Sequence, residues 1–222
     1  MKRFLPFILT LLAVCCTPGP QKVRTGDLLF VGIPADYSLD EDSMGSAISD
    51  ATGEGDLNII HVAILEAADD SVWVIDATIR RGVDRHPLDT FLTDFTLRDG
   101  SLPVLEVRRL DDAEIARRGV ERAGQYLGLP YDVHFLPDNG EYYCSELVRD
   151  CYLDADGKPV FPASPMNFRN AAGEMPVYWV QLFALLGEPV PQGVPGTSPQ
   201  GLRADPRLKV VRPEGFPGQV RE

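Results

Sequence analysis

The sequence predicts an α+β fold in which an antiparallel sheet packs against helices. Four apolar, β-branched runs lie in the first half of the chain, and amphipathic helical patterns follow them. The chain has 222 residues, which is enough for one good hydrophobic core. We therefore expect a single α+β domain over residues 25–222, with a loop-rich C-terminal tail.

The expected strands are short apolar runs bounded by turn residues. Asn58–Glu66 and Val72–Thr78 are separated by Ala67–Asp70, a pattern that predicts a hairpin. Asp27–Val31 and Leu102–Arg108 are the two other expected strands. All four precede the expected helices, so the sheet is formed mainly by the first half of the chain.

Three helices are expected after the strands. Asp111 and Glu114 have the spacing of a capping box at the start of the first helix, which ends before Gly128. The second helix begins near Cys144, and the third covers about Val177–Leu186. The remaining long segments are expected to be irregular.

Two segments are predicted to be loops from their composition. Residues Pro34–Gly55 are rich in Ser, Asp and Gly, which predicts a long surface loop. The tail from Gly187 onward is interrupted repeatedly by Pro and Gly, so it should be mostly loop wrapped over the body.

Charge and composition exclude some classes of function. The formal net charge is -12, from 21 Lys and Arg against 33 Asp and Glu, and phosphate binding needs a basic face instead. Three histidines and four cysteines, with no CxxC pair, provide little material for a metal site. We therefore expect no nucleic-acid partner, no metal and no cofactor.

The N-terminus has the pattern of an export signal. Lys2 and Arg3 precede an apolar run of eleven residues, Phe4–Val14, too short to cross a bilayer. The run ends at Cys15-Cys16, which resembles a bacterial lipoprotein signal in which one of these thiols is lipidated. We expect residues 1–16 to be this signal, residues 17–24 to be a linker, and the protein to be lipid-anchored in the cell envelope; an ordinary secretory signal is the alternative.

Cys144 is the main candidate for chemistry. It lies in the first turn of an expected helix, where the helix dipole and free backbone N–H groups favour a thiolate and can stabilise an oxyanion. Cys151 is about 10 Å further along the axis, too far for a disulfide. A half-buried structural cysteine is the alternative interpretation of Cys144.

A histidine and a carboxylate on the expected hairpin suggest a base for this thiol. If Glu66 faces Ser71 across a four-residue loop, then His61 faces Asp76 directly, on one side of the sheet. A carboxylate at that distance can fix the imidazole, and the imidazole can activate a thiol. We expect His86, in a charged loop, to be solvated, and His134 to lie at the surface.

Several motifs in a fixed order carry a family resemblance. Gly128-Leu-Pro-Tyr131 before a Tyr-Cys-Ser-Glu-Leu run resembles the NlpC-type cell-wall peptidases, which are papain-like cysteine hydrolases. Here His61 precedes Cys144, an order that resembles the circularly permuted branch, the YiiX-like permuted papain-like amidases. Further matching pieces are Thr25-Gly26-Asp27, His61-Val62-Ala63-Ile64, Val74-Ile75-Asp76-Ala77 and the loop Val194–Pro199.

The resemblance implies a fold and a set of roles. It implies a circularly permuted papain-like fold with Cys144 as nucleophile, His61 as base and Asp76 as the orienting acid. Tyr131 matches a tyrosine that reaches the active-site cleft, and Tyr143 replaces an aspartate before the cysteine, so both are expected to border the substrate.

Three functions are compatible with these residues. The first is a thiol hydrolase that cleaves envelope amides, either peptides or N-acyl amino acids and lipids, through an acyl-enzyme. The second is acyl transfer, in which an amine or alcohol resolves the same acyl-enzyme. The third is a non-catalytic envelope-binding lipoprotein that keeps the fold.

Overall fold

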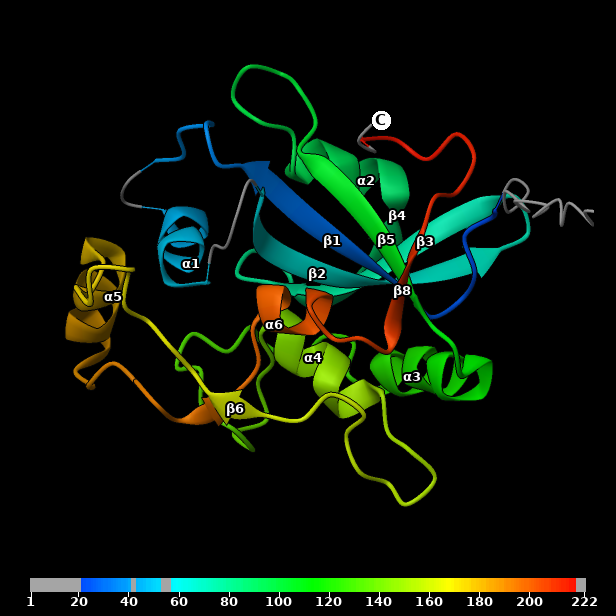
Figure 1. Ribbon diagram of the computed structural model, residues 1–222. Coiled ribbons are helices and arrows are strands. Elements are labelled where there is room, and N and C mark those ends of the chain that lie inside the picture. Colours follow the sequence, from blue (N-terminus) through cyan, green and yellow to red (C-terminus); the bar gives the residue numbers. More distant parts are fainter. Residues whose placement is uncertain (1–20, 41–42, 53–56, 219–222) are drawn as a thin grey trace, which may run out of the picture.

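A computed structural model describes residues 21–40, 43–52 and 57–218 of the chain (Figure 1). The predicted signal, with Cys15 and Cys16, lies outside these described residues. In the described part, an antiparallel sheet has the strand order β4-β3-β2-β1-β5-β8. This arrangement confirms the predicted α+β class with an antiparallel sheet packed against helices.

The sheet is formed by β1 (Asp27–Pro34), β2 (Leu57–Ala68), β3 (Ser71–Thr78), β4 (Gly82–Pro87), β5 (Val104–Leu110) and β8 (Leu208–Val211). A separate two-stranded ladder pairs β6 (Ser164–Pro165) with β7 (Pro195–Gly196). The helices are α1 (Met44–Thr52), α2 (Leu88–Asp94), α3 (Ala113–Gln125), α4 (Cys144–Cys151), α5 (Val177–Leu186) and α6 (Pro199–Arg203). Among the described helices, none has the length and apolar character needed to span a membrane.

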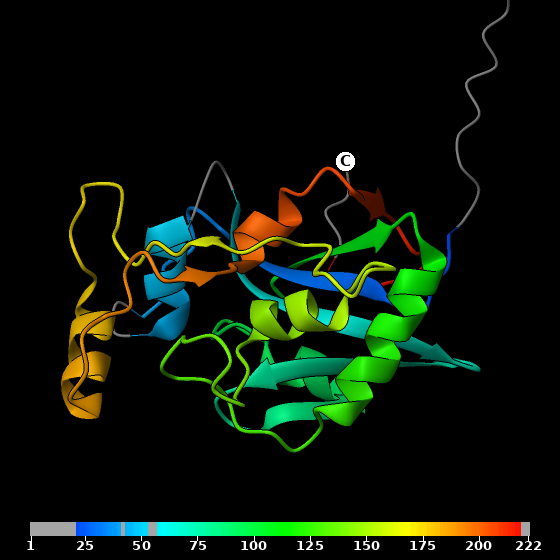
Figure 2. The ribbon, with the colours of Figure 1, turned by 90° about the horizontal axis from the view of Figure 1, so that it is seen from below.

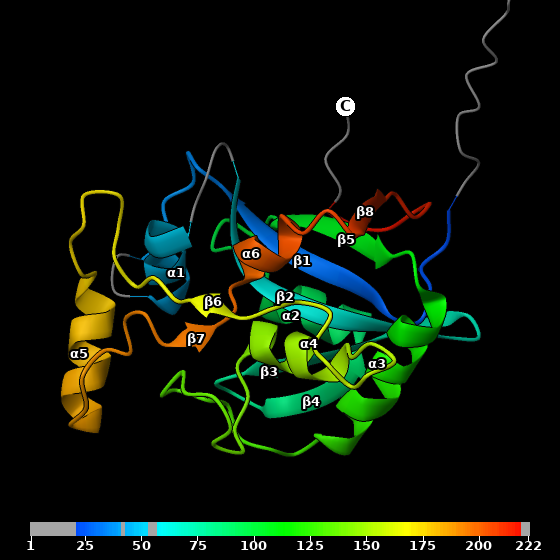
Figure 3. The same ribbon diagram turned by 60° about the horizontal axis from the view of Figure 1, so that its bottom comes forward.

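Both faces of the sheet are covered. Helices α3 and α4 pack on one face, in front of the strands in Figure 3, and α2 lies on the other. Leu28 and Phe30 of β1 join the core on the α4 side, and Leu29 and Val31 join the core on the α2 side. This is why Asp27–Val31 reads as a continuous apolar run rather than as an alternating one.

A third apolar cluster lies beyond the end of the sheet. Figure 2 shows α1 and α5 next to each other there, at a distance from α3. Their side chains pack around Phe135, Phe168 and Trp179, which are all buried. This cluster matters for function because it forms one wall of a cavity described below.

Several predicted elements are confirmed, and two segments predicted to be loops differ. The expected strands and the helices at α3, α4 and α5 are all present. The expected loop Pro34–Gly55 is wrong in part, because Met44, Ala47 and Ile48 give its second half an apolar helical face, which is α1. The tail also contains α6 and β8, since Leu202, Leu208 and Val211 are buried against the body.

The hairpin between β2 and β3 has a different register from the one predicted. Ala68 pairs with Ser71, so the turn has two residues, with Asp69 in the left-handed region (φ 50°), rather than four. The pairing is therefore displaced by two residues, and His61 does not face Asp76 directly. A shift of two keeps every side chain on its original face, so the two side chains still lie on the same side of the sheet.

Helix α3 begins one residue later than the capping-box pattern indicated. Asp112, not Asp111, is the N-cap, and its Oδ1 accepts hydrogen bonds from the backbone N–H groups of Glu114 and Ile115, both at 3.0 Å. The cap satisfies two N–H groups that have no partner within the helix.

The cap can be tested with neighbouring aspartates. Asp112→Ala should lower the free energy of unfolding by about 1 kcal/mol, because it removes the acceptor of both bonds. The measurement is urea denaturation followed by circular dichroism. Asp111→Ala is the matched control and should change stability little; equal effects of the two substitutions would contradict the assignment of the cap.

Candidate active site

Three side chains from three elements meet at one point. His61 comes from β2, Asp76 from β3, and Cys144 is the first residue of α4. His61 Nε2 lies 2.7 Å from Asp76 Oδ2, a hydrogen bond of ordinary length between buried groups. His61 is 7% exposed, Cys144 4% and Asp76 1%. Cys144 and His61 also line one cavity together, so the predicted residues are brought together here.

The backbone pairing of β2 with β3 ends before it reaches His61 and Asp76. The described pairing between β2 and β3 runs from Ala68–Ser71 to Ile64–Ile75, and His61 and Asp76 lie just beyond its last pair. Helix α2 and its C-cap residue Phe95 support the imidazole from one side: the rings of Phe95 and Phe91 have their centroids 4.7 Å and 6.1 Å from that of His61. Packing and the carboxylate together fix the orientation of the ring.

Cys144 is positioned by the start of a helix. Tyr143 is the N-cap residue of α4 and makes no side-chain capping hydrogen bond. The N-terminal backbone N–H groups and the positive end of the helix dipole are therefore next to the sulfur. Both features favour a negative charge at this point, either on the thiolate or on an oxyanion formed by its attack.

The pKa of His61 responds to both partners. Burial alone lowers it, but the negative charge of the Cys144 sulfur and the hydrogen bond with Asp76 raise it more, to about 10. An imidazolium is therefore stable at neutral pH when it lies between a thiolate and a carboxylate. This charge distribution is the one that an activated thiol nucleophile requires.

Cys151, at the other end of the same helix, lies in a different environment. Both cysteines are free and buried, as expected from their separation. Burial, with the nearby Asp150 carboxylate, raises the pKa of Cys151 far above its ordinary value. At neutral pH Cys151 is an unreactive thiol, and it serves as an internal control for Cys144.

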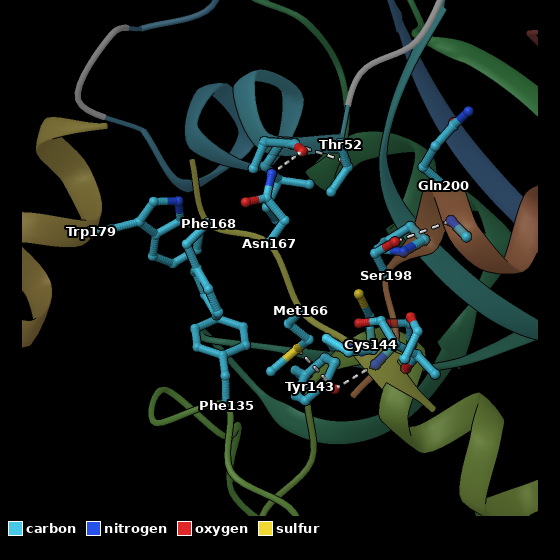
Figure 4. Close-up of a pocket in the computed structure, with 18 of the residues that line it drawn as sticks. Thr52, Phe135, Tyr143, Cys144, Met166, Asn167, Phe168, Trp179, Ser198 and Gln200 are labelled. Carbon is cyan, nitrogen blue, oxygen red and sulfur yellow. Dashed lines mark hydrogen bonds between the residues drawn. The ribbon is translucent and has the colours of Figure 1, made fainter. Parts of the chain in front are cut away.

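The loop after β7 is tied to the start of α4. The backbone N–H of Thr197 donates to Tyr143 Oη at 3.1 Å, and Ser145 Oγ donates to the Thr197 carbonyl at 3.1 Å. Figure 4 draws the hydrogen bond at Tyr143 as a dashed line beside Cys144. Tyr143 thus borders the site as a buried part of its wall, while the predicted contact of Tyr143 with substrate stays a prediction.

Cys144 lies between two cavities. The first has a volume of about 300 Å³ and is bounded by Trp179, Phe168 and Met166 (Figure 4), and the second has a volume of about 520 Å³ and contains His61. Tyr131 lines both, which places it where the two cavities meet, while its predicted contact with substrate stays a prediction. We call the first the Trp179 cavity and the second the His61 cavity.

His86 is not solvated, contrary to the expectation. It lies in β4, is buried, and its ring is stacked on that of Phe91 at a centroid distance of 6.3 Å. Its Nε2 is 3.9 Å from Asp76 Oδ1, the carboxylate oxygen that His61 does not use. The charged segment around His86 forms strand β4 rather than a loop. Its pairing with β3 places His86 opposite Val74, on the same face of the sheet as Asp76.

His134 and Glu146 lie near the site without joining it. His134 Nδ1 forms an ion pair with Glu188 at 2.8 Å at the surface, and this hydrogen bond raises its pKa. Burial, with the charge of Asp132, raises the pKa of Glu146 to about 8, so this carboxyl is mostly protonated at neutral pH. Neither residue lines the Trp179 cavity or the His61 cavity.

The fold and the order of the motifs agree with comparisons to known proteins. A family model described as "Permuted papain-like amidase enzyme, YaeF/YiiX, C92 family" matches residues 22–212. A crystal structure of the metalloprotein YiiX from Escherichia coli O157:H7 is similar at a TM-score of 0.65 and 25% identity, covering 87% of this chain and 99% of that one. None of the curated proteins compared with the chain matches it.

The name of that structure raises the question of a metal. Over the residues that the structure describes here, no group of three or more His, Cys, Asp or Glu side chains is arranged to hold a metal ion. His61, Asp76 and Cys144 instead form a hydrogen-bonded and charge-coupled set. With a family match over most of the chain and the same fold as YiiX, this protein belongs to the YaeF/YiiX family of permuted papain-like amidases.

Proposed function

We propose that the protein is a cysteine amidase in which Cys144 is the nucleophile, His61 the acid and base, and Asp76 the orienting carboxylate. The observation that carries the proposal is the place of His61, bonded to Asp76 at 2.7 Å and next to Cys144 in one cavity. Membership of an amidase family supports hydrolysis as the reaction.

The first half of the reaction forms an acyl-enzyme. The Cys144 thiolate attacks the amide carbonyl carbon, and the carbonyl oxygen becomes an oxyanion near the N-terminal N–H groups of α4. The His61 imidazolium then donates its proton to the leaving nitrogen, the C–N bond breaks, and the amine departs. A thioester between the acyl group and Cys144 remains.

The second half releases the acid. Neutral His61 removes a proton from a water molecule, whose oxygen attacks the thioester carbonyl. The C–S bond breaks, the carboxylic acid is released, and the Cys144 thiolate pairs again with the His61 imidazolium. Asp76 keeps the ring in one orientation throughout, because its hydrogen bond fixes one ring nitrogen.

We place this activity in the bacterial cell envelope, with amides of peptides or N-acyl amino acids as substrates. The apolar run Phe4–Val14 followed by Cys15 and Cys16 supports export and lipidation of one of these thiols. A short linker would then hold the amidase domain close to a membrane surface.

Acyl transfer is a second candidate, and one observation favours it. The Trp179 cavity next to Cys144 is lined by apolar and uncharged side chains. An acyl-enzyme held in such surroundings is partly shielded from water, so an amine or alcohol can compete as acceptor. Product analysis with an added amine distinguishes transfer from hydrolysis.

Substitution of the three residues tests their roles. A thiol-reactive acyl probe, the chloromethyl ketone of an N-acyl amino acid, should label Cys144 at neutral pH. His61→Ala should slow this labelling by about 10²- to 10⁴-fold, the usual contribution of a positioned acid–base group. Asp76→Ala should slow it by a smaller factor, because the imidazole remains but loses its orientation. The measurement is the labelling rate from intact-protein mass spectrometry.

Cys151→Ser is the matched control for this experiment. It removes a buried thiol of the same helix and should leave the labelling rate unchanged, whereas Cys144→Ala should abolish labelling. Equal labelling of wild type, His61→Ala and Asp76→Ala would refute the assigned roles.

The titration of His61 provides a test that needs no substrate. Its pKa of about 10 lies above the ordinary 6.5, so the charged imidazole stabilises the fold fully below pH 6.5, and this contribution is lost as pH rises to about 10. Cys144→Ala should lower this pKa because the negative sulfur is removed. The measurement is an NMR titration of the three histidines, with His134 as the internal control that should not move; an unchanged His61 pKa would contradict the ion pair.

The membrane anchor can be tested by substitution of the two N-terminal cysteines. In a bacterial host, the full chain should partition into detergent after phase separation and carry a lipid-sized mass increment. Substitution of the modified residue, Cys15→Ala or Cys16→Ala, should move the protein to the aqueous phase. Unchanged partitioning of the double substitution would rule out lipidation at this site.

A further inference from the structure

The carboxylate of Asp76 has one oxygen that His61 does not use. Oδ2 is bonded to His61, but Oδ1 is buried and has no hydrogen-bond partner in the part of the chain that the structure describes. Asp76 is only 1% exposed, so water has little access to it. A buried carboxylate oxygen without a donor is energetically costly, so we expect a neighbouring group to serve it.

His86 has a ring nitrogen that faces this oxygen. Its Nε2 lies 3.9 Å from Asp76 Oδ1, and over the described residues neither of its buried ring nitrogens has a hydrogen-bond partner. The distance is about 1 Å longer than a hydrogen bond. Hydrogen bonds between functional groups are often long in the free enzyme and shorten when substrate binds. The unpartnered oxygen and the unpartnered nitrogen are therefore complementary.

A second carboxylate lies near the same ring but has other partners. Asp84 Oδ2 is 3.4 Å from His86 Nδ1. The Asp84 side chain is 40% exposed, and Arg81 Nε approaches the same oxygen at 3.7 Å. Water and Arg81 can therefore satisfy Asp84, whereas the free oxygen of Asp76 depends on His86.

The register of β3 and β4 explains why a ring is needed at this point. Asp76 and Asp84 are directly paired across the two strands, and His86 pairs with Val74 on the same face. Two carboxylates opposite each other on one face repel each other. His86 has one nitrogen toward each of them, so its ring separates the two acids.

Phe91 of α2 supports both histidine rings. It is buried and stacks on His86 at an interplanar angle of 14°, and its centroid lies 6.1 Å from that of His61. Close packing against Phe91 limits the movement of the His86 ring away from the acids. Asp76 is thus next to two imidazoles that share one aromatic support.

We propose that His86 is a positioning residue for the amidase, in which its Nε2–H donates to Asp76 Oδ1 and keeps Oδ2 directed at His61. The functional unit then has four side chains, those of Cys144, His61, Asp76 and His86. This inference rests on the proposed function for its effect on rate, but the contact between His86 and Asp76 can be measured without any reaction.

Nitrogen NMR of isotope-labelled histidine tests the contact and needs no substitution of His86. In the wild-type protein, His86 Nε2 should carry a proton, and Asp76→Asn should shift the ring signals of both His61 and His86. His134, whose partner is Glu188, is the internal control and should not move. A response of His61 alone, or a His86 ring protonated only at Nδ1, would overturn the proposal.

The labelling of Cys144 by the acyl probe tests the effect on rate. His86→Leu removes both ring nitrogens and should slow labelling about tenfold, a loss comparable to that of other groups that orient a functional side chain. His86→Gln places an amide donor near the position of Nε2 and should restore most of the rate. His134→Leu is the matched control, because it removes a surface histidine that is bonded elsewhere, and its rate should equal that of the wild type.

A double substitution separates positioning from a general loss of stability. Because His86 acts through Asp76 in this proposal, His86→Leu should have no further effect on the labelling rate in the Asp76→Ala background. Equal fold-losses in the two backgrounds would show that His86 supports the fold rather than the carboxylate. That result, or equally slow labelling of His86→Leu and His86→Gln, would overturn the proposal.

The outcomes distinguish this inference from the proposed function. If wild-type Cys144 does not react with the probe, the amidase proposal is contradicted, but a joint shift of the His61 and His86 signals in Asp76→Asn still supports the positioning contact. If labelling depends on His61 and Asp76 but is unchanged by His86→Leu, the positioning role alone is contradicted.

Discussion

The hydrogen bond between His61 and Asp76 is the constraint on which the proposed chemistry depends. It joins two neighbouring strands where their described pairing has stopped, so side chains, rather than the backbone ladder, define the geometry there. A buried imidazole without a carboxylate would be neutral, because burial lowers its pKa. With Asp76 on one side and Cys144 on the other, the carboxylate hydrogen bond and the charge of the sulfur outweigh this effect of burial, so the imidazole is held in its charged form at neutral pH.

The sheet and the helices have different tasks in this arrangement. The sheet and α2 hold the imidazole between a carboxylate and two aromatic rings, while α4 supplies the sulfur at its positive end. The loop that contains Thr197 is tied to the first turn of α4 and closes one wall of the Trp179 cavity. Cys144 therefore lies between two cavities. The lining of the His61 cavity includes charged side chains, and the described lining of the Trp179 cavity includes none.

The parts of the fold that were predictable have strong local patterns. The strands could be identified as apolar, β-branched runs bounded by turn residues, the helix at Cys144 from its periodic apolar positions, and the helix Val177–Leu186 from the Pro176 before it and the Gly187 after it. The predicted proximity of His61 and Asp76 survived an error of two residues in register only because the side-chain period of a strand is two. An error of one residue would have placed them on opposite faces.

The parts that were missed depend on tertiary contacts. His86 lies in a segment of alternating charges that resembles a loop, and only its pairing with β3 buries it next to Asp76. Helix α2 follows Pro87 directly and has only seven residues, too short for a clear helical pattern, yet Phe91 and the adjacent Phe95 hold the His61 ring. The Trp179 cavity combines α1, α5, α6 and loops that are far apart in sequence, so no local pattern indicates it.

The most direct test of the central claim is to trap the covalent intermediate. An N-acyl amide substrate is mixed with the protein, the reaction is quenched in acid within its first turnover, and the digested peptides are weighed. The account predicts the mass of the acyl group on the peptide that contains Cys144, and its removal by hydroxylamine, which cleaves thioesters. Substrate hydrolysis with no acyl group on Cys144 at any quench time, or with the group on another residue, would contradict it.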